Sequence, residues 1–273
     1  MLRLETETGW WLIEHPDHAR LAGAFAGAWG NERFLPPEPR SNVLVGIRGH
    51  DDGWAARDSA PQVTREGKPS AFSTELVGKY SAFEEIDLKD YLAVRERAVR
   101  LMAKEDAYAG LLVSMHTYNL LTERADRTTI RPDQLPMLDN FLAAQLNYQH
   151  ELLERVRSGG GFSSVEINDL RIRDHFRLLQ ATDNLSLLSC VGYARPATLL
   201  HPLPLRDGSY TQVRVEPLGQ RQFRLEPYPF ARASMEFHFP ARHVDGKVFT
   251  GTADLQEKFA AASVTPLTVT VTA

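Results

Sequence analysis

The sequence of 273 residues has a single cysteine, Cys190, so it can form neither an internal disulfide nor a zinc site built from paired cysteines. It has no basic excess, because 31 Lys and Arg stand against 35 Asp and Glu, and this balance excludes an obvious nucleic-acid-binding surface. No apolar run approaches the roughly 18 residues that span a bilayer, and the first residues lack the apolar stretch of a signal peptide. We therefore expect a cytoplasmic protein that binds neither nucleic acid nor membranes.

What is present indicates a folded chain with a substantial core. Hydrophobic residues make up 43% of the sequence and charged residues 24%, a composition that is typical of globular rather than disordered proteins. The length suits one large domain or two modest ones.

The periodicity of the apolar residues predicts an α+β fold in three parts. Alternation and a central glycine predict a hairpin within residues 1–14, and helical spacing dominates residues 15–195. Residues 200–273 are expected to be rich in short antiparallel strands that pack on the helices. The expected helices are 18–29, 88–103, 107–122, 135–157, 176–191 and 253–262, the expected later strands are 211–215, 221–226, 234–239, 247–250 and 267–271, and 55–81 is an irregular loop.

Several polar side chains share helix faces with apolar residues and are therefore expected to point inward. They are His18, His116, His150 and Asp183, each three, four, seven or eight residues from Leu, Val or Phe. An inward histidine is commonly an ordinary core residue. An inward aspartate is more informative, because a buried carboxylate is costly unless it is paired or bound to a metal. A salt bridge or a helix cap is an equally good explanation for Asp183.

A His-Asp pair, His50-Asp51, lies between the first and second of these residues. Together with Asp17-His18-Ala and Leu179-Gln-Ala-Thr-Asp183, the order of these residues resembles the HD-domain superfamily of metal-dependent phosphohydrolases. The resemblance covers about residues 15–195 and implies an HD-like helical bundle. The motif His50-Asp51-Asp52-Gly53-Trp54 is also similar to a motif of a bacterial domain family with no assigned reaction.

The resemblance implies a ligand set for one or two metal ions. The first ion would be held by His18, His50, Asp51 and Asp183. The second would be held by Asp51, His116 and His150. Asp51 would bridge the two ions and is therefore a candidate catalytic residue. Imidazole and carboxylate ligands suit Fe, Mn, Co, Ni or Zn. The implied activity is hydrolysis of a phosphate ester or nucleotide. Two alternatives remain open: a di-iron oxygenase on the same scaffold, and a binding or signalling module without catalysis.

The remaining candidates are residues that would act on or bind a small-molecule substrate. Asp52 is a candidate general base and Trp54 a candidate pocket wall, although both also fit an ordinary turn and core. Because the superfamily places basic residues near the phosphate, Arg48, Arg57 and Lys68 are candidate substrate-binding residues, with an exposed surface role as the alternative. The arginines of the C-terminal part leave a homodimer surface open.

Overall fold

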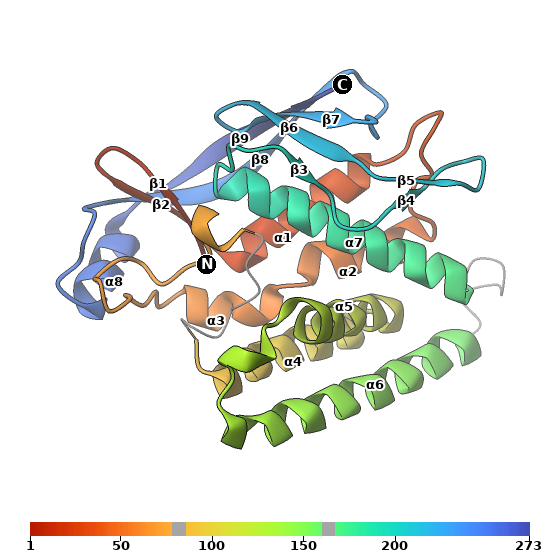
Figure 1. The fold of residues 1–273 in the computed structure, drawn as a ribbon, viewed down its shortest axis with the longest axis horizontal. Coiled ribbons are helices and arrows are strands. Elements are labelled where there is room, and N and C mark those ends of the chain that lie inside the picture. Colours follow the sequence, from red (N-terminus) through yellow and green to blue (C-terminus); the bar gives the residue numbers. More distant parts are fainter. Residues whose placement is uncertain (78–85, 160–166) are drawn as a thin grey trace.

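One seven-stranded sheet contains strands from both ends of the chain (Figure 1). In the computed structural model, which describes residues 1–77, 86–159 and 167–273, its strands are β1 (Leu2–Glu5), β2 (Gly9–Ile13), β3 (Ala197–Thr198), β6 (Arg214–Gly219), β7 (Gln222–Glu226), β8 (Ser234–Asp245) and β9 (Val264–Thr272). Their order across the sheet is β1-β2-β8-β9-β7-β6-β3. A separate ladder pairs β4 (Leu203–Pro204) with β5 (Tyr210–Thr211).

The predicted HD-like helical bundle with two accessory β regions is wrong, although the α+β class holds. The N-terminal hairpin pairs directly with the C-terminal part, where β2 runs antiparallel to β8 and Trp10 lies opposite Val244. The C-terminal strands are not all antiparallel either, because β7 and β9 run parallel. Alternation along one segment shows which face of a strand is buried, but it carries no information about a partner that lies more than two hundred residues away.

The helices lie mainly on one side of this sheet (Figure 1). They are α1 (His15–Ala28), α2 (Arg40–Gly49), α3 (Ala55–Asp58), α4 (Leu88–Glu105), α5 (Ala107–Asn119), α6 (Leu135–Ser158), α7 (Asp169–Cys190) and α8 (Thr252–Ala261). The expected strand at 247–250 is absent, because β8 itself continues to Asp245 and a turn follows. Residues 78–81 of the expected loop lie outside the described ranges.

Helix α1 joins the sheet to the other helices. On its sheet side the ring of Phe25 packs edge to face on Phe237 of β8, with 4.7 Å between the ring centres. On its other side it packs on α2 through Gly23, where a Cβ would lie 2.6 Å from Cβ of Arg48. This close approach fixes the C-terminal end of α2 beside α1.

Helix α5 is buried on nearly all sides, which places it at the centre of the helical layer. Gly46 of α2 allows contact with it, because a Cβ there would lie 3.2 Å from Cα of Ala109. The helix starts at Asp106, whose carboxylate accepts a hydrogen bond from the Ala109 N–H at 2.8 Å. Within the described ranges no helix combines the length and the apolar character that crossing a membrane requires.

Candidate metal centre and its cavity

Five of the six predicted metal ligands meet where α1, α2, α5 and α7 approach one another. His18 comes from α1, His50 and Asp51 from the end of α2, His116 from α5 and Asp183 from α7. All five are buried, none of them more than 6% exposed. Two groups, His18 with His50 and Asp51, and His50 with His116 and Asp183, each have candidate ligand atoms within 4.8 Å of one another. The structure therefore contains buried His/Asp groups that could bind a metal.

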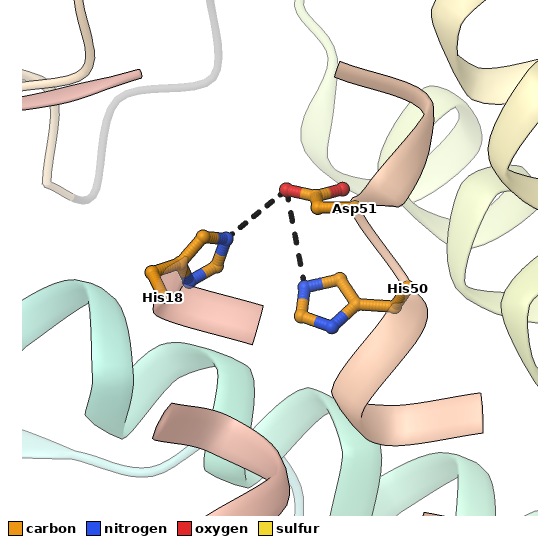
Figure 2. A group of neighbouring side chains, drawn as sticks. All are labelled: His18, His50 and Asp51. Carbon is orange, nitrogen blue, oxygen red and sulfur yellow. Dashed lines mark hydrogen bonds and ion pairs between the residues drawn. The ribbon is translucent and has the colours of Figure 1, made fainter. Parts of the chain in front are cut away.

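The Nε2 atoms of the three histidines face the two carboxylates. His18 Nε2 lies 3.1 Å from Oδ2 of Asp51, and His50 Nε2 lies 3.3 Å from Oδ1 of Asp183. His116 Nε2 is 3.9 Å from the other oxygen of Asp183. Figure 2 shows the His18 and His50 rings directed at the same oxygen of Asp51. The nitrogens and oxygens thus form two overlapping groups that share His50.

The opposite ring nitrogens of His18 and His50 are held by hydrogen bonds that fix their tautomers. His50 Nδ1 donates to the Ile47 carbonyl at 2.7 Å. His18 Nδ1 lies 2.9 Å from Ser186 Oγ, whose own hydrogen goes to the carbonyl of Asp183, so Ser186 accepts from His18. In the neutral form of each ring the lone pair is then on Nε2, as in metal-binding histidines. His50 Nε2 is buried and, within the described ranges, makes no well-aligned hydrogen bond.

His116 is supported by Gln180 of α7, whose amide group lies 3.0 Å from His116 Nδ1. Of the two amide heavy atoms, the oxygen of Gln180 is buried and has no partner among the described residues. Because amide oxygen and nitrogen are assigned from hydrogen bonding, turning this amide pairs its oxygen with the Nδ1–H of His116. That arrangement leaves the Nε2 lone pair of His116 directed at Asp183.

The electrostatics of the cluster are compatible with a bound cation. Burial raises the pKa of Asp51, but Arg95 and His50 outweigh it and hold the pKa well below its ordinary value. The pKa of Asp183 is likewise lowered, against the effect of burial, by His50 and the other two histidines. Burial lowers the pKa of His50, yet the charges of Asp51 and Asp183 raise it to about 9. The two buried carboxylates thus face Arg95 and the proton on His50, and a metal ion could take the place of that proton.

Arg95 of α4 is a residue that the sequence analysis missed. It is buried and forms an ion pair with Oδ1 of Asp51. Its guanidinium group lies 5.5 Å from the ring centre of Trp54 and 5.1 Å from that of Tyr91. Gly53 makes the approach possible, because a Cβ there would collide with the backbone of α4. The available signal was an arginine on the apolar face of a helix, three and four residues from Leu and Tyr.

A second pair that was not selected from the sequence, His15 and Asp58, lies beside the cluster. His15 Nδ1 is 3.0 Å from Oδ2 of Asp58, and burial lowers the pKa of His15 to about 4 despite that carboxylate. The ring of His15 stacks on Trp54 with 4.2 Å between the ring centres. Asp58 also accepts from the amino group of Met1 at 2.7 Å. These contacts fix one wall of the space next to the ligands.

The sixth predicted ligand, His150, does not join the cluster. It is exposed on α6, and Leu146, one turn earlier, is 40% exposed as well. The buried residues of α6 follow a different line along the helix, Leu138, Leu142, Gln145, Leu152 and Val156. Of the face that was expected to point inward, Leu142 is buried, whereas Leu146 and His150 are exposed.

Three of the candidate substrate-binding or catalytic residues also lie elsewhere. Asp52 forms an ion pair with Arg20 at 3.0 Å, and Arg48 one with Glu105 at 3.4 Å, in a separate surface hollow. Lys68 lies 3.3 Å from Glu66 and is not among the residues that line the main cavity.

Trp54 and Arg57, in contrast, line a cavity of about 230 Å³ that opens onto the ligands. His18, Asp51, His116 and Asp183 form its polar end. The rest of the wall comes from segments distant in sequence. Its apolar and aromatic residues include Ala71, Phe72, Leu76, Ile86, Tyr91, Leu120, Ala125 and Leu187, and its polar residues include His15, Ser70, Arg95 and Arg124. Cavities with a few converging polar groups at one end are typical of small-molecule sites.

The comparisons with known proteins give a family but no activity. No curated protein and no solved structure matches the chain. The family model described as "Protein of unknown function (DUF3891)" matches residues 1–246, which is most of the sequence and includes every residue of the cluster. The chain therefore belongs to the DUF3891 family.

Proposed function

We propose that this protein is a metal-dependent hydrolase that acts on an anionic ester, with a phosphate ester as the first candidate. The observation that carries the proposal is the arrangement of the three histidines. Each directs Nε2 at a buried carboxylate, while each Nδ1 contacts a group outside the cluster. A metal ion would replace the proton on His50, whose pKa the charges of Asp51 and Asp183 raise to about 9, and would meet the Nε2 lone pairs and the carboxylate oxygens together.

The donor set favours one transition-metal ion. His18, His50, His116 and Asp183 would hold it, together with the Oδ2 oxygen of Asp51. Three imidazoles with carboxylates suit Fe, Mn, Co, Ni or Zn better than Mg or Ca. The two three-residue groups share His50, so two ions could not each have three ligands from this cluster, and Arg95 takes the other oxygen of Asp51.

A bound ion would polarise the ester and lower the pKa of a water molecule to near neutrality. Residues of the chain would orient the carboxylate and bind the substrate. Arg95 holds Asp51 in its ionised form and in one orientation. Arg57 lines the cavity and is only partly buried, and within the described ranges its one ion pair is the weak contact with Asp90 at 3.9 Å, so its guanidinium could bind an anionic group. The apolar walls exclude bulk water from the reacting ester.

We do not extend the proposal to the di-iron oxygenase, since that alternative needs His150 as a ligand of the second ion. A binding module without catalysis uses the same metal site and differs only in the absence of turnover. The experiment must therefore measure both the metal and the reaction.

The first measurement is the metal content per chain of protein purified without chelators and without a His-tag. The proposal expects about one equivalent of transition metal in the wild type, as in other single-ion sites. The variant Asp183→Asn should lose it, while the matched control His150→Gln, which changes an exposed histidine, should retain it. Thermal melting of each variant shows that the chain is folded.

The second measurement is hydrolysis of 4-nitrophenyl phosphate by the same three proteins. Turnover in the wild type and in His150→Gln, with loss in Asp183→Asn, supports the hydrolase. Absence of metal from the wild type, even after addition of Mn²⁺, Fe²⁺ or Zn²⁺, would overturn the proposal. Metal without turnover on any ester of a broad panel would favour the binding module.

A further inference from the structure

We propose that the substrate is a small anionic ester that carries one apolar group of about the size of a benzene ring. This inference rests on the proposed function and makes it more specific, because it narrows the substrate class. It follows from the two kinds of lining of the cavity, from its volume and from two polar groups in its wall.

The cavity has two kinds of lining. The ligands His116, Asp183 and Asp51 line it where they cluster, and apolar side chains such as Phe72, Leu120 and Leu187 line other parts of the wall. Apolar walls gain nothing from a phosphate or a sugar, which would lose hydrogen bonds to water there. They favour an apolar group, at roughly 25 cal/mol per Å² of surface removed from water.

The volume limits the size of that group. A cavity of about 150 Å³ is enough to bind benzene. The 230 Å³ available here therefore accommodates one such ring and a small headgroup at the polar end. A nucleotide, with a base, a sugar and a phosphate, would need to extend beyond the cavity.

The charge at the polar end selects an anionic headgroup. Two carboxylates, Asp51 and Asp183, face one divalent ion and the guanidinium of Arg95, which leaves one positive charge in excess when the histidines are neutral. Arg57 adds a further cation in the same wall. In a partly dehydrated cavity such an excess favours an anion strongly over a neutral ester.

Trp54 supplies a donor that has no partner inside the described ranges. Its side chain is only 6% exposed, and its Nε1 atom is buried and unpaired there. An indole N–H can only donate a hydrogen bond, and because Nε1 is covered in this structure, an ester oxygen would pair with it only after the wall shifts. The stacked His15 and the guanidinium of Arg95 hold the indole in place.

The test uses two phosphonates that the enzyme cannot hydrolyse as esters, titrated by calorimetry into the metal-loaded protein. Phenylphosphonate and methylphosphonate share the anionic headgroup and differ in the ring. Burial of the ring should make phenylphosphonate bind about tenfold tighter or more. The variant Ala125→Leu, which fills the apolar part of the cavity, should abolish this preference and keep the affinity for methylphosphonate. Its matched control is Ala56→Leu, at an exposed residue outside the cavity.

The outcomes separate this inference from the proposed function. Equal affinity of the two phosphonates in the wild type overturns the inference and leaves the metal-dependent hydrolase standing. Failure of both to bind to protein that contains metal also overturns it. Failure to bind any metal overturns the proposed function and this inference together. An unchanged preference in Ala125→Leu contradicts the placement of the ring in this cavity.

Discussion

Arg95 forms an ion pair with one oxygen of Asp51, while the other oxygen faces His18. The carboxylate is thus shared between a permanent cation of the protein and the candidate metal position. An arginine keeps its charge at any physiological pH. The positive charge that Arg95 places beside Asp51 therefore does not depend on protonation or on a bound metal.

Replacing Arg95 should therefore destabilise the metal-free protein. Arg95→Met leaves the charge of Asp51 without its partner, and breaking a buried pair from one side costs roughly 3–5 kcal/mol. The free energy of unfolding in urea measures this loss. Saturating Mn²⁺ should recover part of it, since the ion interacts with the same carboxylate. Arg97→Met, an exposed position on the same helix, should change stability by less than about 0.5 kcal/mol. Equal effects of the two variants would contradict the role of Arg95.

Ser186→Ala should weaken metal binding without unfolding the protein. The hydroxyl of Ser186 accepts from His18 Nδ1 and fixes its tautomer, and loss of such a partner typically lowers metal affinity about 10–100-fold. Competition with a coloured chelator measures the affinity. Ser189→Ala is a close control, because Ser189 is equally buried on α7 and its hydroxyl also donates to a backbone carbonyl. If both variants bind metal with the affinity of the wild type, the hydrogen bond from His18 to Ser186 does not contribute to metal binding.

Gly53→Ala should separate the turn after Asp51 from α4. A Cβ at this position would collide with the carbonyl of Val94 and lie 2.7 Å from the Ala98 nitrogen, so backbone must move. We expect a loss of about 1–3 kcal/mol and weaker metal binding, because Arg95 moves with α4. Gly251→Ala, where the added Cβ meets nothing within 4 Å, is the control for the substitution itself. Calorimetric melting of both variants measures the loss of stability. Equal losses in the two variants would contradict the role of Gly53.

The buried pair of His175 and Tyr108 should make stability depend on pH. His175 Nδ1 lies 2.6 Å from the Tyr108 hydroxyl, and burial, with a smaller effect of Arg171, lowers the pKa of His175 to about 4. In the unfolded state His175 is protonated below its ordinary pKa near 6.5, whereas in the folded state it stays neutral to a lower pH. The contribution of neutral His175 to the free energy of unfolding is fully present above pH 6.5. It decreases as the pH falls toward 4, by at most about 3 kcal/mol.

The variant His175→Gln removes this titration. Unfolding free energies measured between pH 7.5 and 4 should fall less steeply in the variant than in the wild type. Other buried histidines contribute equally to both proteins, so the difference isolates His175. Parallel curves would show that His175 does not resist protonation in the folded state.

Sequence periodicity was sufficient for the long helices and insufficient for the sheet. The repeats over 88–103 and 107–122 lie on α4 and α5 within a few residues, because each helix shows its buried face locally. The pairing of β2 with β8 depends on two segments that meet only in the fold, and their own residues do not specify each other.

The same limit applies to the site. His18, His116 and Asp183 were selected because they interrupt apolar faces, and the structure brings them together. His150 satisfied the same criterion, but α6 packs through a neighbouring line of residues and leaves it exposed. Arg95 also interrupts an apolar face, and it was overlooked because its partner Asp51 is on another helix.

The pairing of β2 with β8 has a consequence for the order of folding. All five clustered ligands are present once the chain has been synthesised as far as Asp183, yet α1, which carries His18, packs on β8 at residues 234–245. Contacts between such distant segments form late, since a long loop must close first. A nascent chain that ends after α7 would contain every ligand while the sheet side of α1 remained uncovered. We therefore expect the cluster to become rigid only after β8 has emerged, so that any metal it holds would bind after that step.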